Sequence, residues 1–197
     1  FVNYRKAGII AINLEEGNTL VNVVLTSGED EVVLVSHNGM SIRFKEDDMR
    51  TQGRNTIGVR GMRLREGDYV VSISVVNPQA HLLVVSEKGL GKRTGFDEYR
   101  LQSRGGIGIK TMNCTDKTGL VVSATSVTDE DELMIVTSSG QSVRIKVSTV
   151  RETGRATQGV KLITLNDGKE SIQEIPLVIP DDSDGEPAEG IDEESDS

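Results

Sequence analysis

The stretch QSRGGIGIK at residues 102–110 has two counterparts in the chain, QGRNTIGVR at residues 52–60 and TGRATQGVK at residues 153–161. Each copy has Arg at its third position, Gly at its seventh, Ile or Val at its eighth and a basic residue at its ninth. The copies are 50 and 51 residues apart. A period of about 20 to 50 residues is typical of solenoids and propellers, in which each repeat is one supersecondary unit.

Three further landmarks keep the same spacing. They are the apolar runs 32–35, 82–85 and 133–136, the Gly-bearing turns 36–39, 86–89 and 137–140, and the arginines Arg50, Arg100 and Arg151. Residues 1–31 match the second half of a repeat, and the chain begins at Phe1 rather than Met. The period therefore predicts three repeats preceded by a partial one, cut from a longer protein.

Short runs of β-branched and apolar residues, separated by Gly, Asn, Asp and Ser, predict four strands in each repeat. The predicted strands are 31–36, 40–45, 57–64 and 69–76 in the first repeat, 81–86, 90–94, 107–113 and 119–127 in the second, and 132–137, 141–147, 158–165 and 170–178 in the third. Residues 9–14 and 19–26 are predicted as the last two strands of the partial repeat. No stretch has the apolar period of an amphipathic helix.

Four antiparallel strands in about 40 to 50 residues are the pattern of a propeller blade. We therefore expect an all-β, propeller-like fold over residues 1–179, with four-stranded blades at about 32–80, 81–130 and 131–179 and a partial blade at 1–31. Propellers commonly have about four to eight blades, so this number also indicates missing sequence. Aromatic residues make up only 3% of the chain, which favours several small cores of Val, Ile and Leu over one large core.

Charge is distributed unevenly along the chain. Residues 1–179 hold 22 Lys and Arg and 22 Asp and Glu, whereas residues 180–197 hold nine Asp and Glu and no basic residue. The net charge of −9 therefore belongs to the acidic tail, which is almost free of apolar residues and is predicted to be disordered. The neutral body is compatible with a nucleic-acid partner, because its charges can be sorted onto different faces.

No catalytic or metal site is predicted. The single cysteine, Cys114, excludes a disulfide framework and a Cys-based zinc site, and it fits a reducing, intracellular compartment. His37 and His81 lack a neighbouring nucleophile and acid in the sequence, and no phosphate-binding Walker loop is present. No run of 18 apolar residues is available to cross a membrane.

Basic residues recur at equivalent positions of the repeats. In the second predicted strand of the first repeat, Ile42 and Phe44 alternate with Arg43 and Lys45, which predicts a solvated, basic face. Other cations bracket the Gly-rich stretch of each repeat. The candidate DNA-binding residues are Arg43, Lys45, Arg50, Arg54, Arg60, Arg63, Arg65, Lys92, Arg93, Arg100, Arg104, Lys110, Arg144, Lys146, Arg151, Arg155 and Lys161.

Cations at equal angular steps round a propeller rim, beside Gly-exposed backbone amides, suit a phosphate backbone. Without an aromatic stacking platform, the pattern favours duplex over single strands and the reading of DNA shape over base sequence. The acidic runs 29–31 and 129–132 are expected to lie apart from these cations. Two plainer interpretations stay open: Lys and Arg are ordinary on a solvated strand face, and Gly58, Gly108 and Gly159 can serve a bend or a positive φ.

Several runs resemble the C-terminal domain of bacterial DNA gyrase A, and the likeness covers essentially the whole chain. They are residues 26–32, 35–39, 43–46, 55–61 and 91–94. The resemblance implies a β-pinwheel, a propeller-like ring in which neighbouring blades exchange a strand. It also implies that duplex DNA wraps round the basic rim without sequence specificity. This wrapping directs the ATP-dependent negative supercoiling carried out by a type II topoisomerase, an isomerase.

The same resemblance implies a non-catalytic domain without a cofactor of its own. ATP and Mg belong to the parent enzyme, the remainder of gyrase A and the separate gyrase B protein are the partners in a heterotetramer, and the location is cytoplasmic and nucleoid-associated. The family's basic box is matched in part by Gln102, Arg104, Gly105, Gly106 and Gly108. Ser103 and Ile107 replace two basic residues of that box, so a supporting DNA contact is implied. The acidic tail is implied to compete with phosphate for the rim.

Two other functions stay open. One is the matching C-terminal domain of topoisomerase IV, whose blades are fewer and less regular, so that the regular repeats and the acidic tail favour gyrase. The other is a propeller that serves as a protein-interaction scaffold. A scaffold predicts DNA binding with little salt dependence and basic-rim substitutions without effect.

Overall fold

The structure, a computed structural model, describes residues 9–166 and 170–178. Within these ranges it contains β-strands and short 3-10 helices but no α-helix, which confirms the all-β prediction. The strands are β1 (Glu31–Ser36), β2 (Met40–Lys45), β3 (Val70–Val75), β4 (His81–Ser86), β5 (Leu90–Gly95), β6 (Ile109–Lys110), β7 (Val121–Val127), β8 (Glu132–Thr137), β9 (Ser142–Lys146), β10 (Val160–Lys161) and β11 (Ile172–Glu174). The 3-10 helices η1 (Glu46–Asp48), η2 (Phe96–Glu98) and η3 (Val147–Thr149) each follow the second strand of a repeat.

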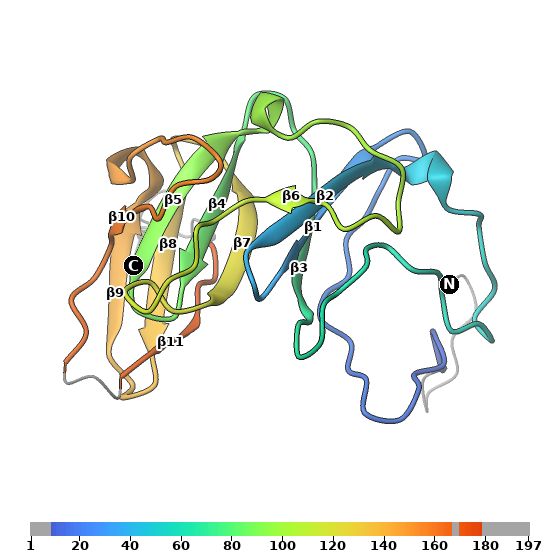
Figure 1. The fold of residues 1–197 in the computed structure, drawn as a ribbon, viewed down its shortest axis with the longest axis horizontal. Coiled ribbons are helices and arrows are strands. Elements are labelled where there is room, and N and C mark those ends of the chain that lie inside the picture. The colour runs from blue at the N-terminus through green and yellow to red at the C-terminus, as the bar shows by residue number, and fades with distance from the viewer. Residues whose placement is uncertain (1–8, 167–169, 179–197) are drawn as a thin grey trace, which may run out of the picture.

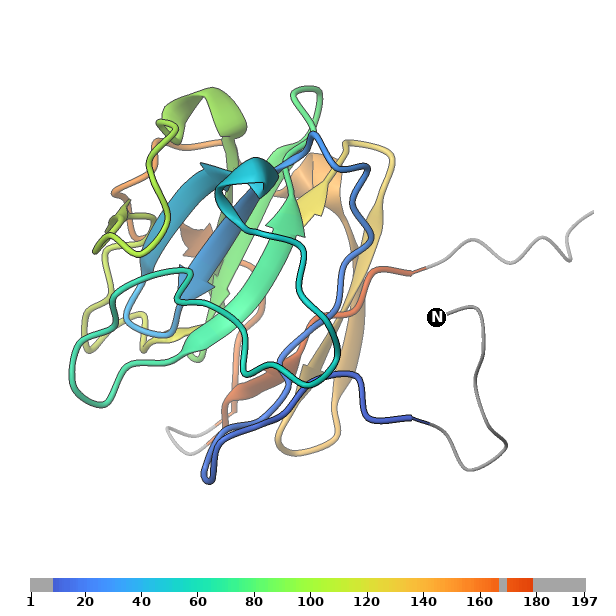
Figure 2. The ribbon, with the colours of Figure 1, turned by 90° about the vertical axis from the view of Figure 1, so that its right-hand side faces the viewer.

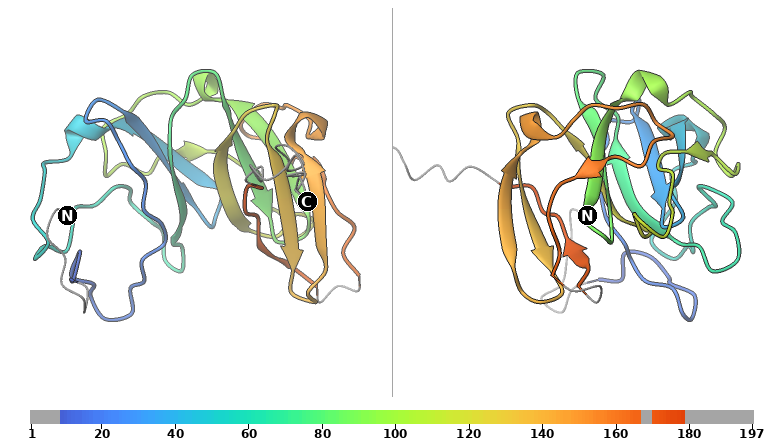
Figure 3. Two further views of the ribbon diagram at one scale, coloured as in Figure 1. Left: turned by 180° about the vertical axis from the view of Figure 1, so that it is seen from behind. Right: turned by 60° about the vertical axis from the view of Figure 1, so that its left-hand side comes forward.

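The strands form three antiparallel sheets, with the orders β3-β1-β2-β6, β10-β5-β4-β7 and β11-β8-β9 (Figure 1). Each sheet is built on a hairpin, β1–β2, β4–β5 or β8–β9, closed by the predicted Gly-bearing turn. In the first hairpin Leu34 lies opposite Ile42 and Val32 opposite Phe44. The sheets follow one another across the molecule in chain order, as both views of Figure 3 show.

Two sheets take their fourth strand from the next repeat. β6 belongs to the second repeat, yet it pairs with β2 of the first, with Lys110 opposite Met40 and Ile109 opposite Ser41. β10 of the third repeat pairs with β5 of the second in the same way. The structure therefore has the strand exchange that the resemblance to a β-pinwheel implied.

Glycine is required where each exchanged strand approaches its host sheet. Gly108 and Gly159 both have a φ of 78°, in the left-handed region that other residues rarely adopt. A Cβ at Gly108 would overlap the carbonyl oxygen of Ser41, and a Cβ at Gly159 would overlap that of Gly91. The backbone interpretation of these two glycines is confirmed.

The predicted third strands are mostly absent. Residues 9–14, 19–26 and 57–64 form no strand, and the strands predicted at 107–113 and 158–165 are only two residues long. For the third strands the reason is the exchange, because this part of a repeat pairs only with the hairpin of the repeat before it. Residues 19–26 were predicted as a fourth strand, which pairs with the first strand of its own repeat, and no such strand precedes them in the described chain. No hairpin precedes residues 57–64 in the described chain. Similarly, β9 has no partner other than β8 in the described chain, so the third sheet has three strands where four were predicted.

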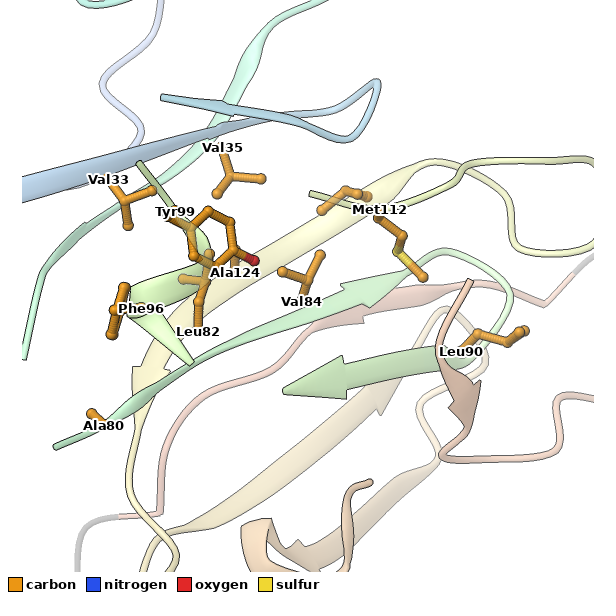
Figure 4. Packing of buried hydrophobic residues seen from close by; sticks show 11 residues of the cluster. Val33, Val35, Ala80, Leu82, Val84, Leu90, Phe96, Tyr99, Met112 and Ala124 are labelled. Carbon is orange, nitrogen blue, oxygen red and sulfur yellow. The ribbon is translucent and has the colours of Figure 1, made fainter. Parts of the chain in front are cut away.

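Three apolar clusters fill the spaces beside the sheets. β4 is buried on both faces, because Leu82 and Val84 belong to the cluster shared with the first sheet and Leu83 and Val85 to the cluster shared with the third. Figure 4 shows the former cluster, with Tyr99 of the second repeat packed among the side chains of β1 and β4. Burial on both faces explains why the first strands are continuous apolar runs.

The packing of the sheets defines an inner and an outer edge. β3 packs against β7, and β7 against β11, so these strands lie on the inner side. β6 and β10 lie at the opposite ends of their sheets and form the outer edge. Figure 2 looks onto the first repeat, where residues 49–69 run as an open loop from η1 to β3. The blade boundaries remain predictions, and the tail predicted to be disordered lies outside the described residues.

Candidate nucleic-acid interface

Most of the predicted basic residues lie at the surface. Lys110 and Lys161 are exposed on β6 and β10, the outermost strands of their sheets. The others lie at the end of the second strand of a repeat or in the connection that follows it. The exposed candidates are Lys45, Arg50, Arg54, Arg60, Arg63, Arg65, Arg100, Lys110, Arg144, Lys146, Arg151 and Lys161.

The arginines of the second strands are paired with acidic side chains. The pairs are Arg43 with Glu31, Arg93 with Asp129 and Arg144 with Glu132. In the first pair Nη2 of Arg43 and Oε2 of Glu31 are 2.5 Å apart. The expectation that the acidic runs lie apart from the cations is therefore wrong. Antiparallel pairing brings the acidic start of the first and third hairpins beside the basic end, whereas Asp129, the partner of Arg93, lies in the connection that follows β7. The charges of these three pairs largely cancel.

Arg43 and Arg93 also bind the next repeat. Nη1 of Arg43 donates to the carbonyl oxygens of Phe96 and Tyr99, at 2.6 and 3.1 Å. Nε of Arg93 donates to the carbonyl oxygen of Val150 at 2.7 Å. Both guanidinium groups are half-buried and hold the turn that follows the next hairpin. These hydrogen bonds hold both side chains against the next repeat, so we leave them out of the interface.

Lys92 does not lie on a solvated face as predicted, because it is 0% exposed. Its Nζ donates to the carbonyl oxygen of Gly154 at 2.8 Å and also to that of Arg155. Burial disfavours the ammonium form and lowers the pKa of Lys92 to about 8. The sequence held a signal for this position: neighbouring strand residues point to opposite faces, so Lys92 and Arg93 could not both point outward.

Arg104 and Arg155 fasten each Gly-rich stretch to the one before it. Nε and Nη1 of Arg104 donate to the carbonyl oxygens of Asp48 and Arg60, at 2.8 and 3.1 Å. Nη1 of Arg155 donates to the carbonyl oxygen of Lys110. Both arginines are half-buried. Their first role is to connect neighbouring repeats, and a DNA contact at either remains a prediction.

The box-like motif packs against the preceding repeat through its backbone. The N–H of Gly105 donates to the carbonyl oxygen of Gly61 at 2.6 Å. The carbonyl oxygen of Gly106 accepts a hydrogen bond from the N–H of Arg63 at 2.7 Å. These bonds place the exposed Arg63 beside the second Gly-rich stretch, so that two repeats contribute cations to one part of the surface.

Eleven of the twelve exposed candidates form no ion pair with any residue that the structure describes. We call them the outer-edge cations. They are Lys45, Arg50, Arg54, Arg60, Arg63, Arg65, Arg100, Lys110, Lys146, Arg151 and Lys161. Every repeat contributes to the set, and the exchange of β6 and β10 places two members at equivalent points of successive sheets.

The histidines lie between repeats. His37 stacks on Tyr69 with its Nδ1 2.7 Å from the carbonyl oxygen of Val121, and His81 lies 3.4 Å from Glu152. Over residues 9–166 and 170–178, no group of three or more His, Cys, Asp and Glu is placed to hold a metal ion. No helix in the same ranges is long and apolar enough to cross a membrane.

Curated relatives match nearly the whole chain. DNA gyrase A of Halalkalibacterium halodurans is 57% identical over 196 residues, which cover 100% of this chain and 23% of the relative. The same protein of Streptococcus pyogenes is 55% identical over 183 residues, covering 93% of this chain and 22% of the relative. That of Escherichia coli K12 is 43% identical over 199 residues, covering 98% and 23%. The chain thus spans less than a quarter of the length of these relatives.

Solved structures agree in fold. A DNA gyrase A C-terminal domain superposes with a TM-score of 0.81 at 30% identity, covering 88% of this chain and 59% of that one. The C-terminal domain of a DNA topoisomerase IV superposes with a TM-score of 0.80 at 26% identity, covering 85% and 52%. The family model described as the DNA gyrase C-terminal domain, beta-propeller, matches residues 1–27, 30–77, 80–128 and 131–174. With two of its three sheets completed by a strand from the next repeat, as the resemblance to a β-pinwheel implied, the chain belongs to the DNA gyrase C-terminal domain family.

Proposed function

We propose that this chain binds duplex DNA without sequence preference and wraps it along the outer edge. The observation that supports this is the set of outer-edge cations, none of which forms an ion pair with an acidic side chain in the described chain. Lys110 and Lys161 are central to it, because strand exchange places them on the outermost strands of successive sheets. Cations that recur on successive sheets suit DNA, because its phosphate groups are regularly spaced along the duplex.

The form of the contact follows from the side chains. Lys and Arg bind phosphate oxygens and set the position of a protein on DNA without reading its sequence. Of the described aromatic residues, Phe44, Phe96 and Tyr99 are buried and Tyr69 stacks on His37, so no aromatic platform is available for unpaired bases. This favours duplex DNA, with a preference for sequences that bend easily.

In the parent protein we propose a non-catalytic domain of the type II topoisomerase DNA gyrase. Wrapping on this domain would direct ATP-dependent negative supercoiling, with ATP and Mg bound elsewhere in the enzyme. The remainder of gyrase A and the separate gyrase B protein would be its partners, and the bacterial nucleoid its location. The curated relatives, which are DNA gyrase A proteins, support this over topoisomerase IV, whose C-terminal domain has a similar fold.

The proposal is tested by the salt dependence of binding to a duplex of about 40 base pairs. The logarithm of the binding constant should fall linearly with the logarithm of salt, with a slope of about −0.9 per phosphate contact. Lys110→Ala combined with Lys161→Ala should flatten the slope by up to ~2 units and weaken binding equally for unrelated sequences. Lys117→Ala removes an exposed lysine outside the outer-edge cations and should leave the slope unchanged.

Each outcome has a defined meaning. A folded chain that does not bind duplex DNA at low salt overturns the proposal and favours the scaffold function. Binding with an unchanged slope in the Lys110 and Lys161 double variant removes these residues as phosphate contacts. An equal effect of Lys117→Ala would show that net charge alone, and not the outer edge, determines binding. Circular dichroism and a cooperative thermal transition establish that each variant is folded.

A further inference from the structure

The second sheet differs from the first at the two positions that face an exchanged stretch. At these positions β2 has Ile42 and Phe44, whereas β5 has Lys92 and Thr94, 50 residues later. All four residues are buried, and Lys92 is 0% exposed. An ammonium group is costly to bury unless its N–H groups are bonded, so the contacts of Lys92 show what the substitution achieves.

Lys92 and Thr94 together hold three successive carbonyl groups. Nζ of Lys92 donates to the carbonyl oxygen of Gly154 at 2.8 Å, to that of Arg155, and to Oγ1 of Thr94 at 3.4 Å. The hydroxyl of Thr94 donates in turn to the carbonyl oxygen of Thr153 at 2.9 Å. The start of the third Gly-rich stretch is therefore bound to β5 through its backbone.

Lys92 is mostly protonated at neutral pH, because its lowered pKa still lies above 7. Burial has the largest effect and lowers its pKa to about 8, Glu98 of η2 opposes this, and Arg155 adds to it. Oε2 of Glu98 also accepts a hydrogen bond from the backbone N–H of Arg155 at 3.2 Å. Burial raises the pKa of the nearby Tyr99, which therefore stays neutral. Hydrogen bonds from a charged ammonium group are stronger than those from a neutral donor.

The equivalent stretch over the first sheet is held differently. Arg104 anchors it with bonds to the carbonyl oxygens of Asp48 and Arg60. Its counterpart Arg155 bonds the carbonyl oxygen of Lys110, and its buried Nε has no partner in the described chain. The third stretch is thus bound less firmly by its own arginine. The buried ammonium group of Lys92 on β5 supplies additional hydrogen bonds to this stretch.

We propose that Lys92 is a positioning residue for DNA binding. It fixes residues 153–155 against β5, and the third Gly-rich stretch, residues 153–161, then presents Lys161 and the remaining N–H groups of Arg155 at the outer edge. The inference rests on the proposed function and assigns part of it to a residue that cannot touch DNA. Because Lys92 is fully buried, its effect on binding must pass through the stretch it holds. Isoleucine at position 42 offers no donor to the preceding stretch, which is held by Arg104 and by backbone hydrogen bonds of Gly105 and Gly106.

The test is Lys92→Met, which removes the ammonium group and keeps an unbranched side chain of similar length. In the 197-residue chain we expect the amides of residues 153–161 to exchange hydrogen at least tenfold faster than in the unaltered chain. The salt slope of duplex binding should flatten by about 1 to 2 units, because up to two phosphate contacts lose their fixed place. Ile42→Met at the equivalent position and Lys117→Met, which removes an exposed charge, should change neither quantity.

A second variant covers the possibility that Lys92→Met does not fold. Thr94→Val keeps the shape of the side chain and removes only the hydroxyl that bonds Thr153. It should also speed hydrogen exchange at the amides of residues 153–155, by a smaller factor than Lys92→Met does. In a Lys161→Ala background, Lys92→Met should weaken binding less than in the unaltered chain, because one of the contacts that Lys92 positions has already been removed.

The outcomes separate this inference from the proposed function. If the unaltered chain does not bind duplex DNA, the proposed function and this inference both fall. If it binds with a salt slope and Lys92→Met leaves slope and exchange unchanged, only the inference falls. Faster exchange with an unchanged slope also overturns it, since the lysine then holds the stretch without placing a DNA contact. The inference is also overturned if the effects of Lys92→Met and Lys161→Ala on the binding free energy are strictly additive.

Discussion

Nη1 of Arg43 in the first repeat donates a hydrogen bond to the carbonyl oxygen of Tyr99 in the second, 3.1 Å away. The same guanidinium group binds the carbonyl oxygen of Phe96 and the carboxylate of Glu31. One side chain therefore joins the start of its own hairpin to the turn of the next repeat. The equivalent Arg144 keeps only its carboxylate partner in the described chain and is exposed.

Arg43→Ala is expected to lower the free energy of unfolding by about 2 to 4 kcal/mol, because it leaves the half-buried carboxylate of Glu31 and the carbonyl oxygen of Tyr99 without a donor. Arg144→Ala removes a surface ion pair and should cost less than ~1 kcal/mol. Urea unfolding of both variants measures the difference. Equal losses of unfolding free energy in the two variants would show that the hydrogen bonds between repeats contribute no stability beyond that of an ion pair.

Gly108→Ala is expected to destabilise the chain by more than ~3 kcal/mol. The left-handed backbone costs about 1 to 2 kcal/mol for alanine, and the new Cβ would also overlap the carbonyl oxygen of Ser41. Gly58→Ala is the matched control, because its φ is 81° and the nearest atom, Cδ1 of Ile12, lies 3.8 Å from the added Cβ. Similar urea midpoints for the two variants would contradict the claim that Gly108 is fixed by strand exchange.

The stability of the chain should rise with pH above 8 because of Lys92. Its pKa is about 8 in the folded chain, mainly through burial, and 10.5 without that environment. Between these values the unfolded chain holds more protons, so the free energy of unfolding increases with pH, by up to ~1.4 kcal/mol per unit. Below pH 8 this contribution is constant. Urea unfolding between pH 7.5 and about 9.5, below the range in which Tyr99 ionises, should show the rise in the unaltered chain but not in Lys92→Met.

Removal of residues 180–197 should tighten binding to duplex DNA several-fold at low salt. The nine carboxylates of this segment carry the sign of phosphate and compete with it for the outer-edge cations. A tail of the same length with Asn and Gln in place of Asp and Glu is the control, and it should behave like the deletion. Titration at several salt concentrations checks both, and an unchanged affinity with an unchanged slope would contradict the competition.

The hairpins could be predicted from the sequence because their signals are local. Apolar runs and Gly-bearing turns placed all six hairpin strands to within one residue at each end. The third strand could not be placed by the same means, since residues 107–113 have a strand-like composition whatever they pair with. Their length is set by contact with β2 of the preceding repeat, which only the resemblance to a β-pinwheel implied.

The basic residues show a second limit of sequence reasoning. Their recurrence predicted that most would reach the surface, and twelve of the seventeen are exposed. The sequence did not reveal which of them are used within the protein. Arg43 finds acceptors in the next repeat, and Lys92 finds carbonyl groups from a stretch more than 60 residues away. Such partners are fixed by the packing of one repeat on another.

Strand exchange leaves each hairpin unprotected while the protein is being made. β2 ends at Lys45, but the strand that covers its edge begins at Ile109, so most of the second repeat must leave the ribosome before the first sheet is complete. An uncovered strand edge can pair with another chain, and the nascent chains of ribosomes that translate the same mRNA lie close to one another. The first two sheets therefore become complete only after the following repeat has been synthesised, so the order of translation is part of how these repeats reach their native state.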